Sequence, residues 1–310
     1  MQVEDELAQF SPGKDMLLAI GVFDGVHLGH KYLLSRLRDI ARQEDLLGGV
    51  VTFRQHPLQI LSPGTELPYL TALTDRVDLL KGEGIEAVIL LSFTPDMAQL
   101  TAREFVGLLK EYLRMRGMVV GPDFALGKGR EGDVATLRNL GQDLGFSVTV
   151  VLPLKTDGEV ISSTAIRSAL TDGDMALVAK LLGRPYGLRG QVTAGAGRGK
   201  GLGFPTANLE ADPRLALPPD GVYATWAFID GQAHQSMTNI GTCPTFGGHE
   251  RTVEVYLLDY RDDLYGRELR VDIVERLRDE KRFDTVDELK KQIGEDVEQG
   301  RAILGSRGRS

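Results

Sequence analysis

The stretch GVFDGVHLGH, residues 21–30, decides how the first half of this chain is expected to fold, together with the apolar run Met16–Ile20 before it. An apolar run, a glycine-rich turn and a segment of helical spacing predict a strand, a tight turn and a helix. Glycines let the backbone approach a ligand closely, and a helix N-terminus attracts anions. Glycines alone would fit an ordinary αβ turn, but His27 and His30 add two imidazoles at the helix start. The stretch therefore predicts a phosphate site.

Length and composition limit the class of protein. The 310 residues are enough for two domains, and the formal net charge of −8 disfavours general binding to nucleic acid or anionic membranes. No apolar run reaches the about 20 residues of a membrane helix. Cys243 is the only cysteine, which excludes an intramolecular disulfide and favours a reducing compartment; we expect a small buried or loop residue rather than a nucleophile. No signal peptide is visible in the first ten residues, so we expect a cytoplasmic location.

Helical and apolar segments alternate after this stretch, which is typical of a parallel α/β sheet. Gly48 and Gly49 end the first helical segment, and a capping box of Thr101 and Glu104 predicts the start of another helix. Loops that follow the strands of such a sheet lie at the edge where α/β proteins bind ligands. Apolar runs predict strands of this sheet at residues 50–53, 87–91, 118–120 and 147–151.

Two of these loops carry polar residues. Residues 53–57 include His56, which we expect to be a turn residue first and a site residue second. Residues 121–132 are polar and rich in glycine, which is typical of a pocket wall or of a solvated turn.

A further pattern, ISSTAIR at residues 161–167, brings hydroxyl groups and a guanidinium to the start of a helix. Ser163 or Thr164 would serve as a helix cap in any protein. Arg167, one turn further, adds paired donors that suit a phosphate group. The segment is therefore a second candidate phosphate site.

The pattern changes near residue 184 from helical spacing to short alternating runs separated by glycine, proline and aspartate, so we place a domain boundary there. A capping box of Thr285 and Glu288 begins a final helix whose apolar stripe predicts packing rather than catalysis. The charged run 277–282 is interpreted as a solvated turn rather than a binding patch. Strands typical of a barrel are expected at residues 221–228, 233–238 and 252–259.

Five motifs, in order over residues 16–302, resemble those of the bacterial bifunctional riboflavin kinase/FMN adenylyltransferases, also called FAD synthetases. In the first half GVFDGVHLGH and ISSTAIR resemble nucleotidyltransferase motifs, and GPDFALG at residues 121–127 resembles the segment that contributes to the flavin and nucleotide pockets. In the second half GFPTAN at residues 203–208 is similar to a hallmark of riboflavin kinases, and NIGTCPTF with TVEVY, residues 239–246 and 252–256, matches the same half.

The resemblance implies an α/β plus all-β chain. A Rossmann-like nucleotidyltransferase domain over residues 1–184 would precede a Greek-key β-barrel riboflavin kinase domain over residues 185–310 with a terminal helix. The implied reactions are phosphorylation of riboflavin to FMN in the barrel and adenylylation of FMN to FAD, with release of pyrophosphate, in the first domain. Riboflavin, FMN and ATP are the implied partners, with ATP as co-substrate, FMN as intermediate and Mg²⁺ as cofactor. Weak self-association is also expected.

For the first domain, the resemblance implies that His27 and His30 stabilise phosphate oxygens as the catalytic pair. No base is expected there, because the phosphate of FMN is already ionised. Gln55 and Leu126 depart from the family pattern. The implied nucleotide-binding residues are Gly21, Phe23, Asp24, Gly25, Ser163, Thr164 and Arg167, and the implied flavin contacts are Asp123 and Phe124.

For the second domain, the resemblance implies that Glu254 is the general base, although a strand carboxylate is often simply exposed. Thr206 and Asn208 are the implied Mg²⁺ ligands, which suits a metal that prefers hard oxygen donors. Lys200 stands where the family commonly has arginine. The implied nucleotide-binding residues are Gly195, Lys200, Gly203 and Pro205, and the implied flavin contacts are Asn239 and Arg278.

Two other functions are open on the sequence. One is an adenylyltransferase whose kinase half has decayed, but Thr206, Asn208 and Glu254 are all present. The other is a flavin-binding regulatory protein without turnover, which has no need of a base. The retained charge-handling residues favour an enzyme with two activities.

Overall fold

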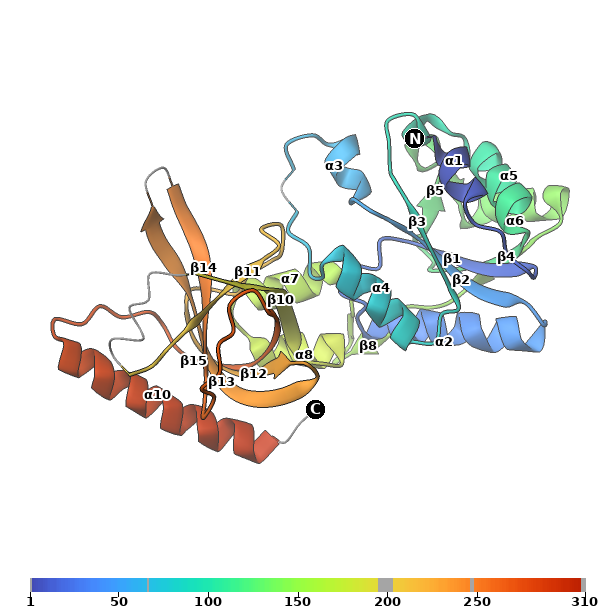
Figure 1. The fold of residues 1–310 in the computed structure, drawn as a ribbon. Coiled ribbons are helices and arrows are strands. Elements are labelled where there is room, and N and C mark those ends of the chain that lie inside the picture. Colours follow the sequence, from blue (N-terminus) through green and yellow to red (C-terminus); the bar gives the residue numbers. More distant parts are fainter. Residues whose placement is uncertain (1, 66, 195–202, 246–247, 308–310) are drawn as a thin grey trace. The chain divides into compact units, whose positions relative to one another are not determined.

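The computed structural model describes residues 2–65, 67–194, 203–245 and 248–307 (Figure 1). The chain forms two compact units. The first comprises Met1–Pro68 and Ala72–Ser162, and the second comprises Tyr69–Thr71 and Ser163–Ser310. Among the described residues, no helix combines the length and the hydropathy needed to span a membrane.

The first unit is built on a five-stranded parallel sheet with the strand order β3-β2-β1-β4-β7. The order changes direction between β1 and β4, and the loops after these strands therefore flank the position where such sheets bind ligands. The strands are β1 Met16–Ile20, β2 Leu47–Phe53, β3 Ala87–Leu91, β4 Met115–Val120 and β7 Ser147–Val150.

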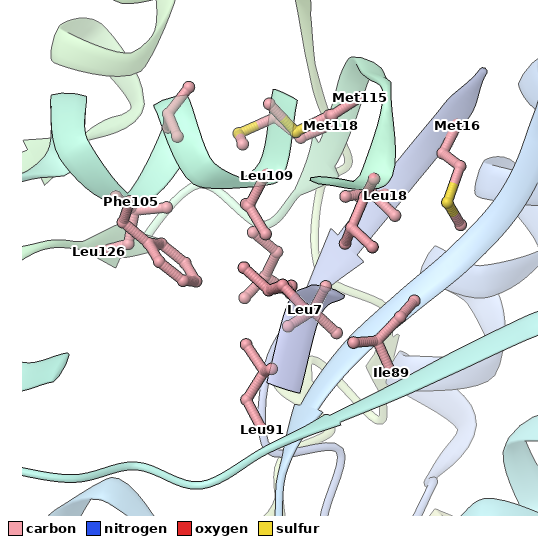
Figure 2. Close-up of a cluster of buried hydrophobic side chains, with 14 of the residues drawn as sticks. Leu7, Met16, Leu18, Ile89, Leu91, Phe105, Leu109, Met115, Met118 and Leu126 are labelled. Atoms are coloured by element: carbon pink, nitrogen blue, oxygen red, sulfur yellow. The ribbon is translucent and has the colours of Figure 1, made fainter. Parts of the chain in front are cut away.

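Helices cover both faces of this sheet and bury two separate apolar clusters. Leu7, Leu18 and Leu109 lie in the first cluster, which Figure 2 shows between α1, β1 and α5. Leu34 and Leu80, from α2 and α4, lie in the second. All five residues of β1 are buried, as expected of a strand covered on both faces. The helices are α1 Val3–Ala8, α2 Leu28–Gln43, α3 Pro57–Leu61, α4 Leu73–Gly82, α5 Ala102–Leu113 and α6 Val134–Leu144.

Short elements complete the first unit. The predicted capping box is present at the start of α5, where the Thr101 hydroxyl donates to Glu104 Oε2 at 2.7 Å and the Thr101 amide donates to the same oxygen at 2.8 Å. The short elements are η1 Met97–Gln99, η2 Lys128–Arg130, and the paired strands β5 Ala125–Leu126 with β6 Gly132–Asp133 and β8 Lys155–Thr156 with β9 Glu159–Val160.

The second unit is a closed antiparallel barrel with the strand order β10-β11-β14-β13-β12-β15. Three consecutive strands, β12 to β14, pair in turn and β15 returns beside β12, which is the Greek-key arrangement. The predicted fold class is therefore confirmed. The strands are β10 Tyr186–Thr193, β11 Ala207–Ala211, β12 Gly221–Ile229, β13 Gln232–Thr245, β14 Gly248–Leu257 and β15 Glu268–Arg278.

Within the described residues, the second unit also contains the helices α7 Ser163–Thr171, α8 Met175–Leu182 and α10 Val286–Arg307. The helix α8 packs against β10 and β15, and its residues Leu181 and Leu182 are buried. This division of the chain lies before α7, whereas the change of sequence pattern placed a boundary after α8. The end of an α/β pattern in the sequence does not reveal which unit its last helices cover.

The separate segment Tyr69–Thr71 also belongs to the second unit. The Tyr69 amide donates to the Arg214 carbonyl, and the Ala216 amide donates to the Tyr69 carbonyl, each at 2.8 Å. The Tyr186 hydroxyl, at the start of β10, donates to the Ala216 carbonyl at 2.6 Å. The second unit therefore contains a piece of chain that the sequence pattern assigned to the first.

Candidate active sites

The glycine-rich stretch forms the predicted turn between β1 and α2. Its backbone is left-handed at three positions, with φ of 53° at Phe23, 84° at Gly25 and 38° at Val26. Left-handed backbone suits glycine, but at residues with a Cβ it costs about 1–3 kcal/mol, and β-branched valine is especially unsuited to it. The surrounding structure must therefore hold this turn in place.

His27 and His30 lie together at the start of α2. Their rings stack with 3.6 Å between centroids and 19° between planes. His27 is the N-cap residue, and its Nδ1 accepts a hydrogen bond from the His30 amide at 3.3 Å, so the proton of a neutral His27 is placed on Nε2. The sequence predicted two imidazoles at this helix start, and the structure adds that one of them also caps the helix.

The surroundings of His30 favour its neutral imidazole. Burial lowers the pKa of His30 well below its usual value, and a charge on His27 would lower it further. His30 Nδ1 is buried and has no hydrogen-bond partner among the described residues. A phosphate group beside the rings would favour the protonated form and would supply an acceptor.

The neighbouring residues of the turn are closely packed. Asp24 is 2% exposed and Phe23 is 4% exposed, and the Phe23 ring lies 5.1 Å from the His30 ring. A Cβ on Gly29 would lie 3.1 Å from both the His27 ring and the Ile161 carbonyl oxygen. Glycine at position 29 thus allows residue 161, at the end of the first unit, to lie against the start of α2.

A cavity of about 650 Å³ opens beside this turn, at the carboxyl ends of β1 and β2. Phe124, a predicted flavin contact, lines it, whereas Asp123 is exposed and its carbonyl accepts from Arg130 Nη2 at 3.0 Å. His56 caps α3 by accepting from the Leu58 amide at 3.1 Å and also lines the cavity, so it is both a turn residue and a wall residue. Other lining residues are Gly21, Val22, Phe53, Phe93 and Met97.

The remaining residues predicted for the first domain lie on α7, in the second unit. Ser163 begins the helix, Thr164 is exposed, and Arg167 follows one turn later with a half-buried side chain. The Arg167 carbonyl accepts from the Thr171 hydroxyl at 2.9 Å within the helix. The hydroxyl groups and the guanidinium are therefore gathered at the start of one helix, as their spacing predicted.

In the barrel, strand register gathers residues that lie far apart in the chain. Glu254 on β14 is opposite Asn208 on β11 and opposite Asn239 on β13. Directly opposed residues share one face of a sheet, so the carboxylate lies between two amides. The Thr206 hydroxyl donates to Glu254 Oε2 at 3.3 Å. All four residues were predicted from the sequence, and the structure brings them together.

A second cavity, of about 490 Å³, lies next to this cluster. Pro205 and Thr206 line it, together with Tyr260 and Leu264 from the segment between β14 and β15. Gly203 has φ of 90°, a conformation that favours glycine. The predicted residues Gly195 and Lys200 lie outside the described part of the chain.

Two predicted flavin contacts already have partners within the barrel unit. Arg278 donates through Nε and Nη2 to Asp296 of α10 at 2.9 and 2.7 Å, and through Nη1 to the Asp279 carbonyl at 2.9 Å. Asn239 Nδ2 donates to Glu280 Oε1 at 3.2 Å. The run 277–282 therefore includes an ion pair that holds α10 on the barrel, which its interpretation as a solvated turn did not anticipate.

Two buried donors of the first unit were not predicted from the sequence. Thr52 and Arg76, from β2 and α4, both donate to the Val22 carbonyl at the start of the left-handed turn. Nothing in their local sequence marks them, because the bonds join segments 30 and 54 residues apart.

The first unit has a glycine-histidine turn where its parallel sheet changes strand order, and the barrel has a threonine-glutamate pair beside a cavity. Together these features define a transferase with two parts that each use a nucleotide. Residues 11–165 match the family model of FAD synthetase, and residues 182–304 match that of riboflavin kinase. The chain belongs to the bifunctional riboflavin kinase/FMN adenylyltransferase family, with the FAD synthetase domain first.

Known relatives agree with this assignment. The chain is 39% identical over 297 residues to the bifunctional riboflavin kinase/FMN adenylyltransferase of Escherichia coli K12, covering 95% of each chain. It is 34% identical over 289 residues to that of Bacillus subtilis, covering 91% of this chain and 90% of the relative. A crystal structure from Streptococcus pneumoniae, described as a macrolide-efflux protein, is similar with a TM-score of 0.88 and 34% identity, covering 95% and 96% of the two chains.

These matches confirm the predicted family and the predicted pair of transferase activities in their predicted order. ATP and FMN follow from those activities as substrate and intermediate. The individual residue roles and the metal stay predictions.

Proposed function

We propose that this chain converts riboflavin to FMN at the Thr206–Glu254 cluster and FMN to FAD at the turn that carries His27 and His30. The observation that supports this most is that part of each proposed site lines a cavity. Gly21 and Val22, which lead into the histidine turn, line the first cavity, and Thr206, which bonds Glu254, lines the second. Both reactions transfer a phosphorus group, and such transfers depend on positioning and charge stabilisation more than on covalent chemistry.

In the first reaction, the 5′-hydroxyl oxygen of riboflavin attacks the γ-phosphorus of ATP, and the bond to the ADP oxygen breaks. Glu254 takes the hydroxyl proton as the new bond forms. The Thr206 hydroxyl, which donates to Glu254 Oε2 at 3.3 Å, orients the carboxylate. The cavity lined by Pro205 and Thr206 would hold the nucleotide, with Gly195, Lys200 and Gly203 as further contacts, while Asn239 and Arg278 would contact the flavin.

The donors around Glu254 fit a magnesium ion. Thr206 supplies a hydroxyl oxygen and Asn208 an amide oxygen, and Asn208 is opposite Glu254 in the strand register. Mg²⁺ prefers such hard oxygen ligands and keeps water and substrate phosphates as its other ligands. When bound, it would neutralise charge on the phosphates. Asn208→Leu should raise the Mg²⁺ concentration that gives half-maximal FMN formation.

In the second reaction, an oxygen of the ionised FMN phosphate attacks the α-phosphorus of ATP, and pyrophosphate leaves. No proton has to be removed from the nucleophile. His27, His30 and the free amides at the start of α2 stabilise the charge on the phosphate oxygens. Ser163, Thr164 and Arg167 bind phosphate oxygens of the nucleotide, for which the paired donors of arginine are suited.

The cavity of about 650 Å³ is the proposed flavin pocket of this second reaction. Phe53, Phe93 and Phe124 line it, and aromatic walls suit a planar ring system. Asp123 would contact the flavin from the adjoining loop. Gly21, Phe23, Asp24 and Gly25 would shape the nucleotide side of the turn.

We further propose a cytoplasmic location, no nucleic-acid partner and weak self-association. The net charge of −8 and the single cysteine support the first two. Size-exclusion chromatography over a range of protein concentrations would test the third.

The test of the proposed function is incubation of the purified chain with riboflavin, ATP and Mg²⁺, followed by chromatographic separation of the flavins. FMN should appear first and FAD later. Glu254→Gln should strongly slow FMN formation but still convert added FMN to FAD. His30→Ala should strongly slow FAD formation but still form FMN. FMN without FAD, or unchanged riboflavin with FMN still converted, would show that one site is inactive.

A further inference from the structure

The carbonyl of Val22 accepts two hydrogen bonds from buried side chains. Thr52 Oγ1 lies 3.0 Å from it and Arg76 Nη1 lies 2.9 Å from it. Thr52 is fully buried and Arg76 is 1% exposed. Val22 directly precedes Phe23, where the backbone turns left-handed with φ of 53°. The two donors therefore meet at the start of the turn that leads to His27 and His30.

Arg76 also joins this turn to the next strand. Its Nη2 donates to the Phe53 carbonyl at 2.6 Å, at the end of β2. A guanidinium is planar and holds its terminal nitrogens at a constant spacing, so it fixes the two carbonyls relative to each other. Arg76 comes from α4, which contributes no other predicted site residue. The side chain thus reaches from a covering helix to the ends of two neighbouring strands.

The turn needs such support because it combines left-handed residues that disfavour that conformation. After Phe23, Val26 is also left-handed with φ of 38°, and His27 follows directly as the cap of α2. A strained backbone persists only where surrounding contacts determine it. Bonds from a charged donor to a buried carbonyl are among the stronger protein hydrogen bonds, so Arg76 is suited to this task. Thr52 adds a bond from a neutral hydroxyl to the same carbonyl.

We propose that Arg76 and Thr52 are positioning residues for adenylyl transfer, which hold the turn so that the histidine pair meets the phosphates. This rests on the proposed role of His27 and His30. The alternative is that Arg76 only anchors α4. If Arg76 were only such an anchor, its removal would lower the unfolding temperature but would leave kcat of FAD formation, expressed per FMN-binding site, unchanged.

The test compares both reactions in the same preparation of each variant. Arg76→Met should lower kcat of FAD formation about 10- to 100-fold, because small misplacements of catalytic groups cost rates of this size. Thr52→Val, which removes only the hydroxyl, should lower it about 3- to 10-fold. Arg76→Lys keeps the charge and one donor but not the planar pair of donors, so it should recover only part of the loss. FMN formation from riboflavin should stay within about twofold of the parent in all three.

Controls separate positioning from unfolding. The number of FMN-binding sites per chain and the thermal unfolding temperature are measured for each variant, and kcat is expressed per site. Arg103→Met removes an exposed guanidinium of the same unit that bonds Asp143 at 2.6 Å, and it should leave FAD formation unchanged. If Arg76→Met does not fold, Arg76→Lys and Thr52→Val still test the proposal, because Thr52→Val must lower kcat per site.

A double variant shows whether Arg76 acts through the histidine pair. In a His30→Ala background, Arg76→Met should cause a much smaller further loss, because the group that it positions is gone. The proposal is overturned if the two losses multiply, or if Arg76→Met keeps the parent kcat while His30→Ala loses FAD formation. If His30→Ala keeps the parent rate, the role of the pair is wrong and this proposal falls with it.

Discussion

The two candidate sites of this chain are assembled in different ways. In the first unit, His27 and His30 lie together at the start of α2. Buried donors from distant segments bind the Val22 carbonyl in the loop that leads to this helix. In the barrel, Thr206, Asn208, Asn239 and Glu254 come from separate strands or the loop before them, and register brings them together. The residues of the helix-start site are close in sequence, but residues far along the chain hold them in position. The residues of the barrel site are far apart in sequence, and the pairing of their strands brings them together.

The largest expected effect is at the barrel site. Glu254→Gln keeps the size and the hydrogen-bonding capacity of the side chain but removes the base, so kcat of FMN formation should fall about 10²- to 10⁴-fold. Riboflavin binding, followed by flavin fluorescence, should change little. Conversion of added FMN to FAD serves as the control. A fast Gln variant would mean that Glu254 is a structural strand residue and that another group takes the proton.

The histidine pair should show the next largest effect. His27→Ala or His30→Ala should lower FAD formation about 100-fold or more, in line with the loss of one donor to a developing charge. FMN formation in the same sample should stay near normal. Because His27 also caps α2, His27→Asn, which retains a capping acceptor, separates the cap from the phosphate role. A parent rate in either alanine variant would contradict the role of that histidine.

A substitution at Arg167 tests whether the cluster at the start of α7 needs the paired donors of a guanidinium. Arg167→Lys should lower FAD formation about tenfold, mainly by raising the KM for ATP, since an ammonium cannot present two parallel donors. Steady-state kinetics at varied ATP would measure this. Full activity in the lysine variant would make Arg167 a structural surface residue.

Fragments of the chain test whether α8 stabilises the barrel. Fragments 185–310 and 163–310 should both phosphorylate riboflavin and stop at FMN, because both retain Thr206, Asn208 and Glu254. The shorter fragment lacks α8, whose buried Leu181 and Leu182 would each contribute about 1.5–3 kcal/mol. It should therefore unfold at a lower temperature. Equal unfolding temperatures would show that α8 adds nothing to the barrel, and a folded but inert fragment would mean that the kinase site borrows other residues.

The smallest expected effect is a pH dependence of stability. Burial lowers the pKa of His30 well below 6.5, so the folded chain excludes a proton that the unfolded chain binds. Stability should therefore be lost as the pH falls below about 6.5, by at most about 1.4 kcal/mol per pH unit for one proton. Denaturant unfolding at about pH 7.5 and pH 5.5 would show a smaller difference in His30→Gln than in the parent chain. The same loss in both would assign it to other groups.

Sequence patterns predicted those elements well that depend on interactions between residues close in the chain. The capping box at Thr285 is present, with the Glu288 amide donating to the Thr285 hydroxyl at 3.2 Å. Gly48 and Gly49 were interpreted as the end of a helix, but both lie inside β2. A Cβ on Gly49 would lie 2.9 Å from Leu18 Cδ2 of β1, so the glycine permits close packing between strands. That requirement comes from the neighbouring strand and cannot be inferred from residues 48–49 alone.

The sequence by itself determined the two kinds of unit and the two imidazoles at the start of α2, and it predicted the residues that meet around Glu254, because periodicity, capping and short motifs depend on nearby residues. Only the tertiary structure decided that Arg76 and Thr52 hold the Val22 carbonyl, that Arg278 pairs with Asp296, and that α8 covers the barrel. These contacts join segments far apart in the chain. They depend on which buried donors and apolar faces come into contact when each unit folds, and no pattern of neighbouring residues predicts those contacts.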